Sequence, residues 1–498
     1  MARHSRRLQR TPSSTTTCPA DLVTTGTDAS ERFPRVPIVV AAAVALVGLF
    51  TRWRLSTGAI GRLNADEAVS GLMARALLKG DWSTFFWGQH YGGTVELLVL
   101  APLLAVIGNA ALWILPALES LLVATLVFRI ARRFLTRDRA LLAAALTWSA
   151  PALWVWFSMR PMLFYQPAMI AGLLIIDLAH PARTSHRWML IGLVAGIGWW
   201  TSPQVLFIAL PACAALMSIR PTRQQWMRLM AGSIVGAAPW LFVNLTTRLA
   251  SLREGPPASG TIAERLQQQV EIGWPMSLGL RTPFHESWII TGGPLIALAI
   301  GGALAAAIVV TMRRYGWNAA IVLTPVVFVP LQVLAPTGGY IGSGRYYVFI
   351  IPSIAVAIVA ALNRVSPFFV AAVASVMVAL SVVGTEEIRN WRMEPTGVET
   401  VAHRLADEGH RAVIADYWSA YLLAWYEPDL VVMPTYTERQ PLWSAEVMEA
   451  TTVTNVVWTG DPNDAARLGD LLAADPPPST VEQWGDWTIV VSAQVGSP

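Results

Sequence analysis

Two adjacent acids, Asp66 and Glu67, follow the first long apolar stretch of the chain. A carboxylate at the edge of a membrane can accept a proton from a hydroxyl group, and partial burial raises its pKa and its basicity. Neighbouring side chains diverge in both helices and extended segments, so one acid can act as a base while the other binds a cation or packs the loop. Alternatively, both acids cap the helix that follows, because the helix dipole favours acids in the first turn. The spacing alone favours neither interpretation.

His90 and Glu96 are polar groups on either side of a Gly-Gly pair that leads into an apolar stretch. Polar groups at the entry to a bilayer usually mark a pathway or a site. Together with Asp66 and Glu67 they offer four oxygen or nitrogen ligands, so a divalent cation is a possible cofactor. Their spacing matches no regular metal motif, and the sequence predicts no definite cofactor.

Aromatic side chains crowd the same segment, where Tyr91 follows Trp82, Phe85, Phe86 and Trp87. Tyrosine and tryptophan gather at both membrane interfaces because their rings are amphipathic. An interfacial belt therefore explains these residues more simply than direct stacking on a sugar ring, although both interpretations remain open.

Arg345 and Tyr346 follow a glycine-rich loop at residues 336–344. A guanidinium group offers planar donors that match a phosphate, and glycines allow a close approach of the backbone. The alternative is an interfacial arginine whose charged end reaches back to the lipid headgroups.

The composition indicates what kind of protein must position these residues. Of 498 residues, 54% are hydrophobic and only 14% are charged, whereas soluble domains have about a quarter of their residues charged. The chain therefore belongs in a bilayer, and the formal net charge of +4 reflects arginines in short loops rather than a nucleic-acid partner. The two cysteines, Cys18 and Cys213, lie in unlike segments, which excludes a disulfide framework and a thiolate metal site.

A spanning helix needs about 20 mainly apolar residues, and this criterion predicts about eleven transmembrane helices. The stretch at residues 95–108 is short and is predicted to be re-entrant or interfacial. The predicted spans are residues 36–53, 111–128, 140–157, 162–179, 188–201, 203–219, 229–246, 288–312, 317–335, 346–362 and 367–384.

Arginine placement predicts the orientation of these spans. Counted along the sequence, thirteen arginines fall in the short loops on the side of the N-terminal tail, and only Arg160 and Arg345 fall in the short loops opposite. Positive charge accumulates on the cytoplasmic side. We therefore expect a multi-pass protein of the cell membrane with a disordered cytoplasmic tail at residues 1–35, a transmembrane domain at 36–384 and an extracytoplasmic C-terminus.

Three outer segments are long enough to carry function. The first covers about residues 54–108, the second residues 247–287, and the third the tail at 385–498. The tail alternates helical and strand-like patterns and predicts a small extracytoplasmic α/β domain. Its expected helices are residues 397–409, 419–426 and 461–474, and its expected strands are residues 412–415, 430–433, 455–458 and 487–492.

Three motifs carry a resemblance to a known family: Asp66-Glu67-Ala68, Trp87-Gly88-Gln89-His90-Tyr91-Gly92-Gly93-Thr94-Val95-Glu96, and Gly344-Arg345-Tyr346-Tyr347 before Pro352. The chain resembles the glycosyltransferase family 39 and aminoarabinose-transferase-like branch of the GT-C superfamily, relatives of the protein O-mannosyltransferases. The resemblance covers residues 36–384, and residues 415–421 also resemble the outer tail of bacterial members. It implies a polyprenyl-phosphate sugar donor.

The resemblance also implies roles for the candidate residues. Asp66 becomes the catalytic base with Glu67 as its partner, and the substrate-binding candidates are His90, Tyr91, Glu96, Arg345 and Tyr346. The acceptor elements of the protein-directed branch are not recognisable here. A glycan, lipid or protein acceptor therefore stays open.

The predicted function is an inverting membrane glycosyltransferase of the cell envelope that moves a hexosyl or pentosyl group to an extracytoplasmic hydroxyl. One alternative is a transporter or flippase of a lipid-linked sugar, although no internal repeat supports it. Another is a non-catalytic envelope-assembly protein that binds a partner through an aromatic surface. That surface would comprise Trp418, Tyr421, Trp425 and Tyr426, whose near-helical spacing is more typical of a core.

Overall fold

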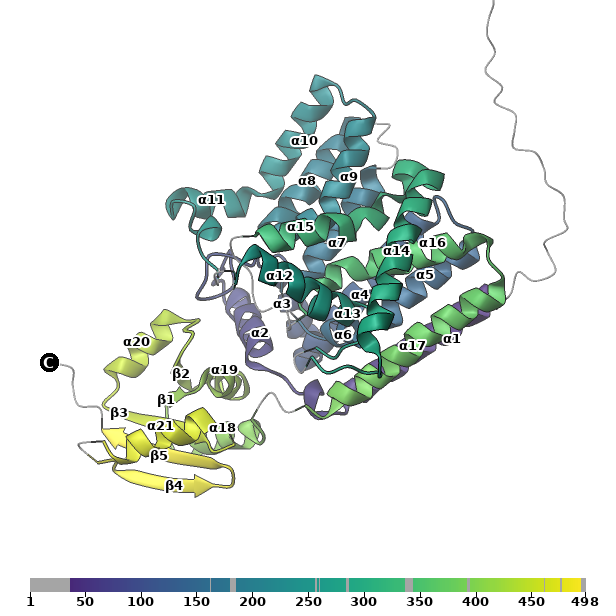
Figure 1. Ribbon diagram of the computed structural model, residues 1–498. Helices are drawn as coiled ribbons and strands as arrows, with labels where there is room; N and C mark the ends of the chain where they lie inside the picture. The colour runs from purple at the N-terminus through teal and green to yellow at the C-terminus, as the bar shows by residue number, and fades with distance from the viewer. Residues whose placement is uncertain are drawn as a thin grey trace, which may run out of the picture.

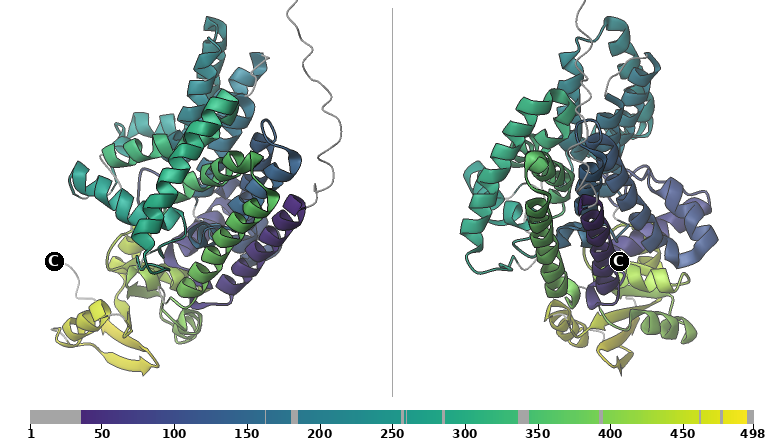
Figure 2. Two further views of the ribbon diagram at one scale, coloured as in Figure 1. Left: turned by 45° about the vertical axis from the view of Figure 1, so that its right-hand side comes forward. Right: turned by 90° about the vertical axis from the view of Figure 1, so that its right-hand side faces the viewer.

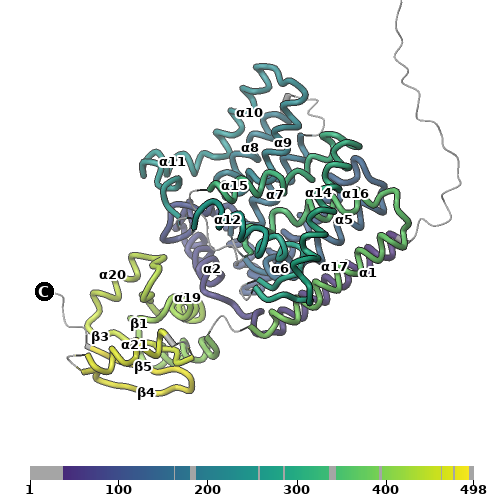
Figure 3. The backbone as a smooth tube through the Cα atoms, in the orientation of Figure 1, coloured from purple at the N-terminus to yellow at the C-terminus, as the bar shows by residue number. Residues whose placement is uncertain are grey.

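The computed structural model describes residues 36–161, 163–179, 185–255, 258, 260–283, 286–335, 344–391, 395–460, 462–474 and 477–493. The predicted disordered tail at residues 1–35 lies outside the described residues, as does most of the glycine-rich loop before Arg345. The chain forms a large helical part and a small α/β part that lies beside α2, as Figures 1 and 3 show.

The helical part extends from α1 to α17. Its α-helices are α1 (Val36–Ser56), α2 (Ala65–Leu78), α3 (Leu97–Ile107), α4 (Ala111–Ala131), α5 (Arg137–Ser149), α6 (Ala152–Phe157), α7 (Tyr165–Ala179), α8 (Ser185–Thr201), α9 (Leu206–Ser218), α10 (Arg223–Gly236), α11 (Ala238–Thr246), α12 (Ile262–Gln268), α13 (Trp274–Ser277), α14 (Gly293–Tyr315), α15 (Thr324–Leu334), α16 (Ile351–Ala361) and α17 (Pro367–Arg389). The long helices α1 and α17 run side by side along one edge (Figures 1 and 2).

Each apolar range predicted to span coincides with one helix or with two consecutive helices. Residues 140–157 are divided at Pro151 into α5 and α6, and residues 229–246 are bent by 65° between α10 and α11, next to Pro239. Proline lacks the backbone donor that a continuous helix needs, which explains both breaks. The apolar runs therefore located the helices, whereas the prolines divided them.

Within the described residues, five helical stretches are long and apolar enough to cross a membrane, or six if the bent pair α10–α11 forms one span. They are Pro37–Ser56, Leu97–Ala131, Gly293–Leu334, Tyr347–Arg364 and Pro367–Arg389. The chain is thus a mostly helical protein with helices of the membrane-spanning kind. The number of about eleven transmembrane helices stays a prediction.

The stretch at residues 95–108 forms its own short helix, α3. It ends where Gly108 adopts a φ of 60°, a conformation that glycine tolerates without steric cost. With 11 residues, α3 is about 16 Å long, roughly half the thickness of a bilayer core. Helix α3 alone is therefore too short to cross a membrane, whereas the stretch Leu97–Ala131 that contains it is long enough.

Helices α8 and α10 pack with their backbones in contact. Gly192 and Gly196 of α8 face Gly232 and Gly236 of α10, and a Cβ atom at Gly192 would lie 2.0 Å from the carbonyl oxygen of Leu229. Glycines four residues apart on each helix therefore permit this approach, which is a frequent packing mode of membrane helices. The spacing is present in the sequence, but the spacing alone does not identify the partner helix.

The C-terminal part contains a five-stranded sheet in the order β2-β1-β3-β5-β4. The pairs β1–β2 and β1–β3 are parallel, whereas β3–β5 and β5–β4 are antiparallel. The strands are β1 (Ala412–Ala415), β2 (Val431–Pro434), β3 (Thr452–Trp458), β4 (Thr480–Trp484) and β5 (Trp487–Ala493), and the helices are α18 (Val398–Asp407), α19 (Tyr417–Tyr426), α20 (Pro441–Glu449) and α21 (Pro462–Leu472).

The predicted small α/β unit is therefore present, and its four expected strands overlap β1, β2, β3 and β5. The sequence missed α20 and β4. Strand β4 is exposed along most of its length, so it shows no alternation of apolar and polar residues that would reveal it. Helix α17 continues to Arg389, past residue 384, where the transmembrane part was expected to end.

Helix α19 packs against α2. Tyr421 and Trp425 of α19 are only 1% and 2% exposed, while Trp418 and Tyr426 are half-buried. The aromatic surface expected of an envelope-assembly protein is therefore largely an internal contact. Burying these large rings against α2 stabilises the association of the two parts.

Candidate active site

The site is built around the start of α2. Asn64 is the N-cap, and its side chain accepts a hydrogen bond from the Glu67 backbone at 3.0 Å while the Glu67 carboxylate accepts one from the Asn64 backbone at 3.1 Å. This reciprocal pair is a capping box, which satisfies two backbone donors at once. It turns Glu67 back toward the cap and leaves Asp66 pointing elsewhere.

Glu67 is fully buried and forms an ion pair with Arg160, which is only 2% exposed. Arg160 also donates to the backbone carbonyls of Ile60 and Arg62. Burial raises the pKa of Glu67, and the charge of Arg160 opposes that shift. The interpretation that the acids cap the helix thus applies to Glu67, which does not line the cavity described next.

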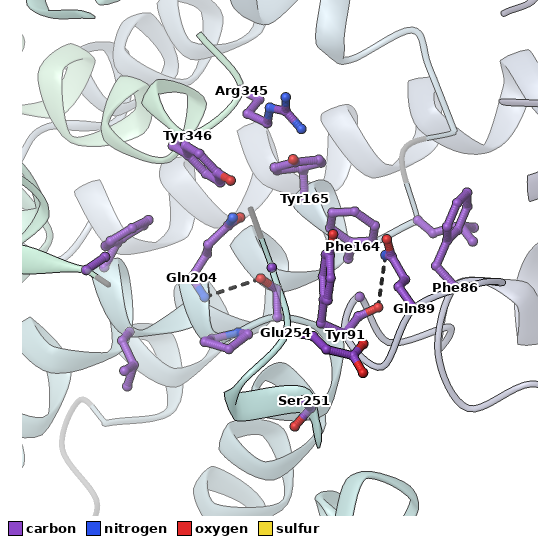
Figure 4. A pocket seen from close by; sticks show the side chains of 18 of the residues that line it. Phe86, Gln89, Tyr91, Phe164, Tyr165, Gln204, Ser251, Glu254, Arg345 and Tyr346 are labelled. Atoms are coloured by element: carbon purple, nitrogen blue, oxygen red, sulfur yellow. Dashed lines mark hydrogen bonds between the residues drawn. The ribbon is translucent and has the colours of Figure 1, made fainter. Parts of the chain in front are cut away.

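Asp66 lines a cavity of about 550 Å³. Its side chain is 40% exposed, so a ligand in the cavity can reach its carboxylate. Figure 4 shows the other groups around this space. Of the predicted site residues, Asp66, Tyr91, Arg345 and Tyr346 line the same cavity, although the last two lie far from Asp66 in the chain.

Arg345 and Tyr346 enter the cavity from the turn before α16. The hydroxyl group of Tyr165, at the start of α7, is hydrogen-bonded to Arg345, and both tyrosine rings lie near the guanidinium group in Figure 4. Arginine stays charged at all accessible pH values. The cavity therefore holds a fixed positive charge with donors suited to phosphate.

Tyr91 lies on the opposite wall, between Gln89 and Glu254 in Figure 4. Burial raises the pKa of Tyr91, so its phenol stays protonated at neutral pH and can donate a hydrogen bond. Gln89 donates to the Tyr91 carbonyl at 3.0 Å, which fixes the turn that carries both residues.

His90 is not among the residues that line the cavity, and it holds a neighbouring segment in place. Its backbone donates to Glu254 at 3.0 Å, and its Nδ1 atom lies 2.7 Å from a Glu254 oxygen. Glu254 itself lines the cavity. Substrate binding by His90 was expected, whereas the contact observed here anchors the second outer segment to the first.

Glu96 does not reach the cavity either. It is 3% exposed at the start of α3, and neither carboxylate oxygen accepts a hydrogen bond from a described residue. Burial raises its pKa to about 8. Among the described residues, no three acidic, histidine or cysteine side chains gather closely enough to hold a metal ion. Asp66, Glu67, His90 and Glu96 therefore do not form the four-ligand cation site that the sequence left open.

Two groups from the C-terminal part reach Asp66, and the sequence did not predict either. The Tyr417 hydroxyl donates to Asp66 Oδ1, and Arg439 Nη2 lies 3.9 Å from the same oxygen. Arg439 also lines the cavity. The hydrogen bond from Tyr417 joins residues 351 positions apart, and no local pattern encodes such a separation.

The remaining walls are largely apolar. Leu206 and Phe207 of α9 face the cavity together with Leu331 and Leu334 of α15. Leu334 is 64% exposed on the outside of the helices. The cavity thus combines a charged end with an apolar wall, an arrangement that suits an amphiphilic ligand.

Comparison with known proteins shows a likeness in structure alone. No family model and no curated protein sequence matches the chain. The crystal structure of ArnT from Cupriavidus metallidurans in the apo state matches with a TM-score of 0.63 and 15% identity, over 92% of this chain and 98% of that one. The Archaeoglobus fulgidus oligosaccharyltransferase in its apo form matches with a TM-score of 0.48 and 11% identity, over 85% and 70% of the two chains.

Another structure of that archaeal oligosaccharyltransferase, AglB, holds an inhibitory peptide and a dolichol-phosphate. It matches with a TM-score of 0.47 and 11% identity, over 88% of this chain and 71% of that one. The likeness to ArnT shows that the chain has a GT-C fold.

Proposed function

We propose that this chain, which has the GT-C fold, is a membrane glycosyltransferase. It moves a sugar from a polyprenyl-phosphate donor to a hydroxyl group of an extracytoplasmic acceptor. One observation carries the proposal. A single cavity contains the accessible carboxylate of Asp66, the guanidinium group of Arg345 and an apolar wall.

The two ends of the donor fit the two ends of the cavity. A polyprenyl chain is apolar and suits the wall of Leu206, Phe207 and Leu331, whereas its phosphate suits the donors of Arg345. This arrangement would hold the anomeric carbon of the sugar near Asp66. The amphiphilic lining thus supports a lipid-linked donor over a fully water-soluble one.

The reaction then needs one base and one cation. Asp66 takes the proton of the acceptor hydroxyl as the acceptor oxygen bonds to the anomeric carbon, and the bond from that carbon to the phosphate oxygen breaks. The electron pair leaves with the polyprenyl phosphate, whose added charge Arg345 stabilises. Attack from the face opposite the leaving phosphate inverts the anomeric configuration.

Asp66 is better placed for this role than its neighbour. Only its Oδ1 atom accepts a hydrogen bond from a described side chain, namely from Tyr417, so Oδ2 is available to an acceptor. Glu67 is closed off by Arg160 and the capping box. We therefore assign Glu67 to holding the helix start rather than to the chemistry.

The experiment compares wild type, Asp66→Asn and Asp81→Asn, each purified and incubated with a panel of radiolabelled polyprenyl-phosphate sugars and a cell-envelope extract that supplies glycan, lipid and protein acceptors. Asparagine keeps an oxygen for Tyr417 but is no base, so Asp66→Asn should lower donor consumption by at least about 100-fold. Asp81 is an exposed acid of the same outer segment, and Asp81→Asn should retain the wild-type rate.

Two results would contradict the proposal. Failure of the wild type to consume any donor would remove the activity itself. Equal consumption by wild type and Asp66→Asn would remove Asp66 from the base role.

A further inference from the structure

We infer that Arg439 of the C-terminal part binds the phosphate group of the lipid together with Arg345, so that the two parts of the chain share one active site. This inference rests on the proposed function and adds a binding residue from a domain whose role the sequence left open. It also commits to one ligand chemistry, a phosphate carried on a polyprenyl chain.

The connection between β2 and α20 brings Arg439 to the cavity, where its side chain is 15% exposed. The Arg439 backbone donates to the Tyr421 hydroxyl at 2.6 Å. Gly88 packs so closely on this connection that a Cβ atom there would lie 2.3 Å from the Glu438 carbonyl oxygen. The position of Arg439 is therefore set by packing on both sides.

The guanidinium group of Arg439 is held by neutral partners. Its Nε donates to the Tyr417 hydroxyl at 3.2 Å and its Nη1 to Gln89 at 2.9 Å. The separation of 3.9 Å between Nη2 and Asp66 is too long for a hydrogen bond. The Nη2 donor therefore bonds no described residue and remains available to a ligand in the cavity.

Arg345 and Arg439 act on the same space from opposite domains. Asp66 interacts electrostatically with both guanidinium groups, and so does the Tyr91 phenol. The other acid in the lining, Glu254, is already paired with His90. The cavity lining thus contains two guanidinium groups and two carboxylates, and Asp66 is the carboxylate that interacts with both guanidinium groups.

The free Nη2 donor of Arg439 beside Arg345 favours a phosphate as the ligand. Partial burial of a guanidinium group that no carboxylate contacts within hydrogen-bonding distance costs free energy, and an anion in the cavity would recover it. A donor phosphodiester carries one negative charge, and the departing phosphate monoester carries more. A second arginine therefore stabilises the products and the transition state more than the bound donor.

The test measures binding of polyprenyl phosphate and of the uncharged polyprenol to the purified full-length protein. Variants are Arg439→Gln, Arg439→Lys and Arg75→Gln. Arg75 is the matched control because it also crosses to the C-terminal part, donating to the Trp425 carbonyl at 2.8 Å and stacking on that ring, but it does not line the cavity.

Arg439→Gln should weaken polyprenyl-phosphate binding by about 10-fold or more and leave polyprenol binding unchanged, since an interaction between charged groups is lost. Arg439→Lys should restore part of the affinity because it restores the charge, and Arg75→Gln should bind like the wild type. Inorganic phosphate at the concentration of the lipid should not displace polyprenyl phosphate, which separates a lipid site from a site for free phosphate.

Three outcomes would overturn the inference. They are equal affinity of wild type and Arg439→Gln, an equal loss in Arg75→Gln, and displacement of the lipid by inorganic phosphate. An unchanged lipid affinity with a raised acceptor KM would assign Arg439 to the acceptor instead. The assay uses no sugar, so Arg439 is tested even if no donor is consumed and the proposed transfer fails.

Discussion

Asp66 and Glu67 are consecutive residues with different surroundings. Successive side chains on a helix point about 100° apart, so the first turn of α2 directs Glu67 to the buried Arg160 and Asp66 to the cavity. From the sequence, capping and catalysis were alternatives for the whole pair. The fold gives one of these roles to each acid, and only long-range packing decides which.

A change at Glu67 should reduce stability. Glu67→Gln keeps an oxygen for the capping box but leaves the charge of Arg160 buried without an anionic partner, which we expect to cost about 3–5 kcal/mol. Tryptophan fluorescence during thermal unfolding in detergent would show a lower midpoint.

Glu264→Gln is the matched control, because Glu264 completes an equivalent capping box on Thr261 but is exposed. It should shift the unfolding midpoint little. An equal shift in both variants would mean that the cap, and not the ion pair, carries the effect.

Glu96 should make stability depend on pH. Burial raises its folded pKa to about 8, above the usual value of about 4.3 in an unfolded chain. The folded state therefore binds this proton more tightly, so stability should fall as the pH rises through that interval, by about 1.4 kcal/mol for each unit of difference.

Glu96→Gln removes one of two interacting acids, because Glu119 of α4 interacts electrostatically with Glu96. The variant should therefore have a higher unfolding midpoint than the wild type at pH 8 and a weaker dependence of that midpoint on pH. Thermal unfolding of both proteins from pH 5 to pH 8 is the measurement. Parallel pH profiles for the two proteins would contradict the assignment.

Some of the residues that line the cavity could be predicted from the sequence. Asp66, Tyr91, Arg345 and Tyr346 were candidates and line one space, because each belongs to a motif with recognisable chemistry. His90 and Glu96 belong to the same motifs but lie outside the cavity. His90 contacts Glu254, and Glu96 is buried. Their orientation depends on neighbours that local patterns do not specify.

At the level of helices, apolar runs located almost every element of the membrane part. The runs could not show that α5 and α6, or α10 and α11, would be separate, because hydropathy does not register a bend. The proline positions carried that information. Elements with little buried surface, such as β4, left no periodic signal.

The glycine contact between α8 and α10 predicts a strong effect of added volume. Gly232→Val places side-chain atoms where a Cβ alone would lie 2.1 Å from the Met189 carbonyl, so the helices must separate and we expect a loss of at least about 1–3 kcal/mol. Thermal unfolding and the yield of folded protein would measure it.

Gly302→Val in α14 is the control, since nothing lies within 4 Å of a Cβ atom there. It should leave the unfolding midpoint near that of the wild type. A similar loss at both positions would show that helix propensity, and not the contact, is responsible.

At the level of the whole molecule, the sequence predicted a helical part and an outer α/β part but not how they meet. Helix α19 lies on α2, where Trp425 leaves no room for a Cβ atom on Gly71. Nothing in either segment alone indicates its partner. The docking therefore follows from shape and aromatic burial across the complete chain.

Gly88→Ala should disturb that docking. Gly88 has a φ of +69° and touches the backbone of Glu438 and Arg439, so a methyl group adds a clash to the conformational cost of a left-handed residue. We expect faster hydrogen exchange in residues 435–440 and a drop in transfer rate of about 10-fold or more, as for a displaced binding group.

Gly80→Ala separates the two causes, because Gly80 also has a positive φ, of +90°, but open space around it. It should cost stability of about 1 kcal/mol without altering exchange at residues 435–440. Equal exchange in the two variants would contradict a role for the contact with Glu438.

Arg160 is buried beneath Glu67 and Arg345 lies in the cavity wall, so neither charge faces the lipids. This placement also affects which lipids surround the protein. With the predicted orientation, the short loops at the outer leaflet expose little positive charge, whereas the short loops at the inner leaflet carry most of the arginines that set the topology. Anionic phospholipids should therefore enrich around the cytoplasmic rim and leave the opposite annulus close to the bulk composition.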